Sequence, residues 1–198
     1  NIENFSAKTS AAKTKLIAES FVNKMQSPDI IGIVEMQDND GQDATNTSAA
    51  DKSYERLIEA IKAAGGPEYK YINIDPVYNQ DGGAGGANIR PGFLYNPNRV
   101  QLAEGVAGDN QTAVAYKDGK LSHNPGLVDP THEAFKSSRK PIAAQFVFNG
   151  EEVLVINNHF NSKSGDTALF GATQPPVLSS EVQRNQIAEQ LKAFVESV

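Results

Sequence analysis

Two hydrophobic periods alternate along the chain, one typical of helices and one typical of strands. Residues 11–26 predict an amphipathic helix that ends before Ser27-Pro28. Its apolar positions recur three to five residues apart: Leu16, Ile17, Phe21, Val22 and Met25. A continuous apolar run over 29–36 then predicts a buried strand. Residues 37–50 are polar and predict a long loop, and a second helix is expected over 54–64.

The middle of the chain favours strands. Single strands are expected over 69–74, 92–95 and 100–106. A hairpin is expected to turn at Lys117-Asp118-Gly119-Lys120, and a second one at Asn149-Gly150 would join 142–148 to 153–156. Since hairpins pair their strands in opposite directions, the sheets should be mostly antiparallel.

A third helix is expected over about 179–197. Its apolar stripe consists of Val182, Ile187, Leu191, Phe194 and Val195. Helices at both ends of a strand-rich centre predict an α+β layered sandwich, with mostly antiparallel or mixed sheets flanked by helices, rather than a doubly wound parallel sheet. No repeat or linker interrupts the pattern, so residues 1–198 are interpreted as a single domain.

Composition limits the function classes. A chain of 198 residues with 39% hydrophobic content can bury a substantial core. Its formal net charge of -6 argues against a basic face that grips nucleic acid, although a divalent cation could supply positive charge locally. The absence of Cys excludes thiolate zinc sites, disulfides and Cys nucleophiles. No apolar stretch reaches the length of a membrane span.

The segment 155–163 carries the strongest chemical signal. An apolar strand runs directly into Asn158-His159 and then into a polar loop with Ser162 and Lys163. Because a rigid element positions His159, its imidazole is a candidate acid or hydrogen-bond donor. His123 and His132 lie in loop-like sequence, where a solvated surface histidine is the simpler interpretation.

Glu35 ends an apolar strand, where a carboxylate can meet solvent or a hard cation. The alternative is a solvated acid without a ligand. The following Asp38-Asn39-Asp40-Gly41 hints at a calcium loop, but Met36 and Thr47 stand where an EF-hand needs oxygen ligands. That interpretation is therefore set aside.

Two further stretches suggest contacts with a phosphate. The glycine-rich run over 81–88 matches neither a P-loop nor a dinucleotide motif, and is better interpreted as a turn that lets Asn88 and Arg90 approach a ligand. Arg139 opens the strand whose hairpin partner leads to His159, so Arg139 is expected near the His159 end of the sheet. A guanidinium can hold a phosphate in a bidentate fork.

Several segments follow one another in a recognisable order: Asn1–Phe5, Pro28–Glu35, Gly86–Val100, Ser138–Pro141, Asn158–Lys163 and Arg184–Ala188. Together they resemble the endonuclease/exonuclease/phosphatase superfamily, with its deoxyribonuclease I-like fold, and especially its secreted bacterial nucleases. The segment ending in Val34-Glu35 is similar to the motif that usually reads Leu-Gln-Glu. The family's Gly-Asp-x-Asn strand and terminal Ser-Asp-His have no counterpart here, so the resemblance implies the N-terminal two-thirds of such a domain.

The resemblance implies a set of roles. Glu35 would hold Mg²⁺, or Mn²⁺ or Ca²⁺, and Asn1, with Asn4 as second choice, would lie beside the metal. His159 would be catalytic, and phosphate contacts would come from residues already singled out: Arg139, Asn158, Lys163, Asn88 and Arg90.

The implied activity is divalent-metal-dependent phosphodiester hydrolysis by a secreted or cell-surface nuclease acting on DNA or RNA. The alternatives are a phosphatase or lipid phosphodiesterase of the same superfamily, or a non-catalytic binding domain. A C-terminal fragment of the same protein is an expected partner that would complete the fold. This chain alone is expected to be inactive.

Overall fold

The computed structural model describes all residues, 1–198, and contains three α-helices. Helix α1 (Ala11–Glu19) continues into a π-helical turn, η1 (Ser20–Lys24), and is followed by α2 (Asp51–Ala63) and α3 (Ser179–Glu196). All three predicted helices are therefore confirmed, although α2 begins three residues earlier than its apolar pattern suggested. None of the helices is long and apolar enough to cross a membrane.

The strands form two main antiparallel sheets. The first contains β1 (Ile30–Met36), β3 (Arg90–Tyr95) and β2 (Lys70–Asn73), in that spatial order. In the second, β8 (Ile142–Phe148) pairs with β4 (Val100–Leu102), β7 (Gly126–Leu127) and β9 (Glu151–Asn157). A small hairpin joins β5 (Tyr116–Lys117) to β6 (Lys120–Leu121). Both predicted hairpins are present.

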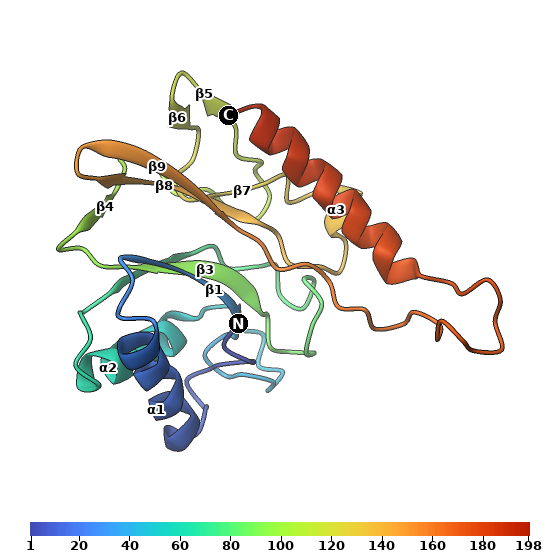
Figure 1. Cartoon of the computed structure of the whole chain (residues 1–198), viewed down its shortest axis with the longest axis horizontal. Helices are drawn as coiled ribbons and strands as arrows, with labels where there is room; N and C mark the ends of the chain where they lie inside the picture. Colours follow the sequence, from blue (N-terminus) through green and yellow to red (C-terminus); the bar gives the residue numbers. More distant parts are fainter.

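The two sheets pack face to face, with helices on their outer faces (Figure 1). Alternation along β8 explains this layering, since Ile142, Ala144 and Phe146 pack into the cluster between the sheets. Ala143 points the other way and packs near Phe194 of α3. Helices α1 and α2 cover the first sheet through a separate cluster. The chain is thus an α+β sandwich with antiparallel sheets, in agreement with the predicted class.

The predicted helix stripes are partly wrong. Leu16 and Met25 are 65% and 49% exposed, whereas Thr14, Ala18 and Phe21 are the buried positions of the first helix. The π-helical hydrogen bond from Met25 N to Ser20 O adds a residue to the last turn. The side chains of that turn therefore point in other directions than a regular helical period predicts. In α3 the end positions of the stripe are exposed, and Ile187 and Phe194 make the buried contact.

Candidate functional site

Glu35 lies at a β-bulge near the end of β1. Pairing with β3 is regular from Ile30 to Ile33 and resumes at Met36 in a shifted register. Glu35 itself has φ of 67°, in the left-handed region that a non-glycine residue seldom adopts. Bulges re-aim side chains. Here the bulge turns the carboxylate out of the ladder and into a partly open position.

The N-terminal segment holds the Glu35 carboxylate from both sides. Asn1 Nδ2 donates to Oε1 at 2.7 Å, and the backbone N–H of Asn4 donates to Oε2 at 3.1 Å. Residues 1–5 are not a regular strand, because Glu3 and Asn4 have positive φ and only one parallel bridge, Phe5 to Met36, is formed. Both asparagines nevertheless contact the carboxylate that was expected to hold a metal, Asn1 through its side chain and Asn4 through its backbone.

His159 reaches the same carboxylate from the second sheet. Its Nε2 lies 3.6 Å from Glu35 Oε1, and its Nδ1 is buried without a hydrogen-bond partner. Burial lowers the pKa of His159, as do Arg139 and the N-terminal amine, while Glu35 acts in the opposite direction. The lowered pKa favours a neutral imidazole near pH 7, which can donate one N–H to a ligand.

Arg139 lies on the loop just before β8 and is 5% exposed. Its Nη2 donates to the carbonyl of Phe160 at 2.8 Å, which fixes the guanidinium beside the His159 loop. Nε is buried and has no partner. Burial lowers the pKa of Arg139, and Asp81 and Glu35 oppose this shift. An arginine remains protonated in proteins, so this is a buried cation with a free donor.

These side chains line one open pocket of about 440 Å³, here called the Glu35 pocket. A carboxylate, a guanidinium and an imidazole enter it from β1, from the loop before β8 and from the end of β9. The remaining lining residues are Asn4, Gly83, Ala84, Ile89, Ser137, Asn161, Ser162, Ser164 and Gln183. The pocket therefore combines one group that can hold a cation with two groups that can bind an anionic oxygen.

Two of the predicted phosphate ligands lie close to this pocket without lining it. Asn158 is half-buried, and its Oδ1 has no hydrogen-bond partner. Lys163 is exposed between Ser162 and Ser164, which do line the pocket.

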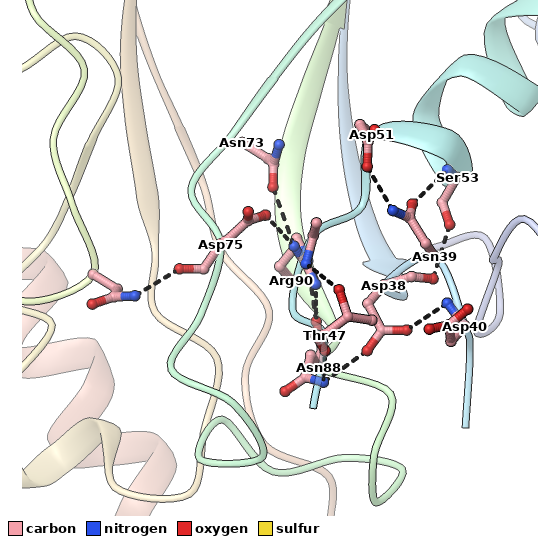
Figure 2. Close-up of polar contacts among 12 residues, drawn as sticks. Asp38, Asn39, Asp40, Thr47, Asp51, Ser53, Asn73, Asp75, Asn88 and Arg90 are labelled. Atoms are coloured by element: carbon pink, nitrogen blue, oxygen red, sulfur yellow. Dashed lines mark hydrogen bonds and ion pairs between the residues drawn. The ribbon is translucent and has the colours of Figure 1, made fainter. Parts of the chain in front are cut away.

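Asn88 and Arg90 are not brought to the pocket. Figure 2 shows them in a buried network on the first sheet, where Asn88 Nδ2 donates to Asp38 Oδ2 at 2.7 Å. Arg90 donates to the Asn88 carbonyl and pairs with Asp75. Arg90 is 1% exposed, so its donors are occupied and unavailable to a ligand. The expectation that the glycine-rich turn presents these two side chains is corrected accordingly.

The sequence reasoning missed Asn157, the last residue of β9. Its Nδ2 donates to the carbonyls of Ile33 in β1 and Gly92 in β3, both at 2.8 Å. Since β9 belongs to the other sheet, this one side chain joins the two sheets two residues before His159. The only signal in the sequence is an asparagine at the end of an apolar strand. Asparagine is also common where a strand simply gives way to a loop, so this signal does not identify a contact between sheets.

The residues present fit a small, hard divalent cation. No cluster of three or more Asp, Glu, His or Cys side chains is arranged to hold a metal. Mg²⁺, however, is often bound through one or two carboxylates, with water and substrate phosphate completing its coordination. Glu35 supplies such a carboxylate. Asn161 contributes a buried Oδ1 that lines the pocket and lacks a partner.

A scan of the chain against protein-family models finds no match, and comparison with curated proteins likewise finds no significant match.

Proposed function

We propose that this chain forms the metal-binding and phosphate-binding part of a phosphodiesterase of the endonuclease/exonuclease/phosphatase superfamily. The substrate would be DNA or RNA, and the protein a secreted or cell-surface nuclease. The observation that carries the proposal is the convergence of Glu35, Arg139 and His159 on one pocket. The three residues come from three separate motifs that are far apart in the sequence. A catalytic site requires such residues to meet at one place, as these do.

Each side chain has a distinct part in the proposed reaction. Arg139 would bind a non-bridging phosphate oxygen through its unpartnered Nε, because a guanidinium bond to a charged oxygen is both strong and directional. His159, neutral near pH 7, would donate an N–H to a second oxygen. This lowered pKa favours the hydrogen-bonding role over the alternative, proton transfer from an imidazolium.

Glu35 would hold a divalent cation, with Asn1 and Asn4 fixing the direction of its carboxylate. When bound, Mg²⁺ or Mn²⁺ neutralises charge on the phosphoryl oxygens. The resemblance assigns positioning of the attacking water to Asp-x-Asn and Asp-His elements that this chain does not contain. Binding of metal and phosphate is therefore tested alongside hydrolysis.

The proposal is tested by measuring Mn²⁺ and inorganic phosphate binding, together with cleavage of bis(p-nitrophenyl) phosphate, DNA and RNA in the presence of Mg²⁺. Arg139→Ala should weaken phosphate binding, and Glu35→Gln should weaken Mn²⁺ binding. Asn98→Ala, an exposed position remote from the pocket, serves as the control. Failure of the wild-type chain to bind either ion would refute the proposal. Hydrolysis of phosphate monoesters but not diesters would point to a phosphatase instead.

A further inference from the structure

A second cavity lies directly beside the Glu35 pocket. It has a volume of about 480 Å³ and is lined in part by Asp81, Ser137 and Lys140, so it is called the Lys140 pocket. Ser137 lines both cavities. None of the residues assigned to the proposed reaction lies in the Lys140 pocket, which leaves its chemistry unexplained.

A thin wall of backbone separates the two cavities. Gly82 packs so closely on Ser137 that a Cβ at position 82 would lie 2.2 Å from the Ser137 carbonyl oxygen. Both residues have positive φ, 68° at Gly82 and 50° at Ser137. On either side of Gly82, Asp81 lines the Lys140 pocket and Gly83 the Glu35 pocket. The two cavities therefore adjoin each other at this one turn of chain.

The charges on the two sides of this wall differ. Arg139 lines the Glu35 pocket and makes no ion pair, whereas the next residue, Lys140, lines the other cavity. Lys140 pairs with Asp81, and both side chains are largely buried, at 13% and 8% exposure. The free cation thus favours phosphate on one side. The neutralised pair favours an uncharged polar group on the other.

The lining of the Lys140 pocket indicates the kind of group. Only three of its fifteen lining residues are hydrophobic, and four carry carboxamides. The carboxamide residues are Asn79, Gln80, Asn110 and Gln111. A carboxamide offers a donor and an acceptor side by side, which matches the edge of a nucleobase. Gln80 and Gln111 are exposed and line this cavity. The Gln111 Nε2 donates to Asn110, which leaves its Oε1 as the free group, whereas the Gln80 carboxamide makes no hydrogen bond within the protein.

We infer that the Lys140 pocket is the nucleoside subsite of this protein, holding the base of the nucleotide whose phosphate occupies the Glu35 pocket. This inference rests on the proposed function and deepens it, because it assigns a separate cavity to the base of the nucleic acid whose phosphate the Glu35 pocket would bind. Gln80 and Gln111 contact the base edge. Lys140 and Asp81 shape the floor of the subsite and keep it electrically neutral.

The test compares equilibrium binding of adenosine 5′-monophosphate, ribose 5-phosphate and inorganic phosphate by titration calorimetry. The nucleotide should bind about tenfold more tightly than either of the others, as expected for one good carboxamide contact to a base. The double variant Gln80→Ala/Gln111→Ala should lose this advantage and keep its affinity for phosphate. Gln101→Ala, an exposed carboxamide on β4, should change nothing.

Equal affinity for the nucleotide and ribose 5-phosphate would overturn the inference, because the base would then contribute no binding. A nucleotide advantage that survives in the double variant would also overturn it, since the base would bind elsewhere. In both cases phosphate binding would persist and the proposed function would stand. Loss of binding for all three ligands would instead refute the phosphate site, and the subsite with it.

Discussion

The backbone of Glu35 shows how one residue can determine the chemistry of a site. A left-handed conformation costs an L-residue about 1–2 kcal/mol, and it is kept only where surrounding contacts compensate. At Glu35 the compensation comes from the Asn1 amide and the Asn4 N–H, which both bind the carboxylate. The side chain nevertheless remains 20% exposed and lines the pocket.

Replacing Glu35 with Gln tests this arrangement. The variant keeps the shape of the side chain but loses its charge, so Mn²⁺ affinity should fall about tenfold or more. The free energy of unfolding should change by only about 1 kcal/mol, because the amide oxygen of Gln can still accept one of the two hydrogen bonds from Asn1 and Asn4. Electron paramagnetic resonance of Mn²⁺ and urea unfolding measure the two quantities.

Glu104→Gln is the matched control, since Glu104 is exposed and forms no ion pair. It should leave Mn²⁺ affinity unchanged. Equal affinities for the wild type and Glu35→Gln would remove Glu35 from the metal site, whatever the control shows.

Among the structural elements, the loop over residues 81–84 requires glycine at a position that borders the site. At Gly82 the backbone has φ of 68°, and a methyl group would collide with the Ser137 carbonyl. Gly82→Ala should therefore lower the free energy of unfolding by at least about 2 kcal/mol. Gly85→Ala, in the same run but facing open space, should be nearly neutral. Thermal unfolding of both variants makes the comparison, and similar melting temperatures would contradict the close packing at Ser137.

Asn157 joins the two sheets at the level of the site. Asn157→Ala removes two hydrogen bonds, to Ile33 and Gly92, and should cost about 1–3 kcal/mol in the free energy of unfolding. It should also weaken Mn²⁺ binding, because the distance between Glu35 and the second sheet is no longer fixed. Asn98→Ala is the control. A variant with normal stability would show that the sheets are held together by their apolar cluster alone.

The sequence predicted the longer elements because their hydrophobic periods are repeated several times. Helix α3 and the β8–β9 hairpin are examples, with the turn at Asn149-Gly150 marked by its own residues. Strand β7 has two residues and η2 (Glu133–Phe135) has three, so neither can display a period. Strand β4 ends at Leu102, four residues before its predicted end.

The sequence indicates which residue types could form the site, but it does not reveal where each side chain points. Glu35, Arg139 and His159 each stand at the end of a strand or just before one, and the structure brings them together. Arg90 also stands at a strand end, yet it points into the network with Asn88 and Asp75. Its direction follows from tertiary contacts between distant segments, which a single sequence does not reveal.

At the scale of the whole molecule, the Glu35 pocket lies where the two sheets meet. Glu35 belongs to the first sheet, whereas Arg139 and His159 are attached to the second, so the site exists only when the layers are packed. Binding of a ligand that bridges the layers should therefore stabilise the complete fold rather than one element. The same coupling makes the charge state of His159 part of the overall stability.

The pH dependence of unfolding follows from the lowered pKa of His159, whose ordinary value is 6.5. A lowered folded-state pKa means that the unfolded chain binds the proton more tightly, so stability rises with pH through this window. The contribution is complete above the ordinary value and is lost as pH falls through the lowered one. Protonation would place a cation beside Arg139 and the N-terminal amine, with only Glu35 to offset them.

Urea unfolding of the wild type and of His159→Gln at about pH 5 and about pH 7.5 measures this contribution. The wild type should gain more stability over that interval than the variant, which cannot be protonated at position 159. Burial raises the pKa of Asp38, Asp75 and Asp81 and gives contributions of opposite sign, but these are common to both proteins and cancel in the comparison. Identical pH profiles would mean that the pKa of His159 is the same in the folded and unfolded protein, which would contradict the lowering by burial and by Arg139.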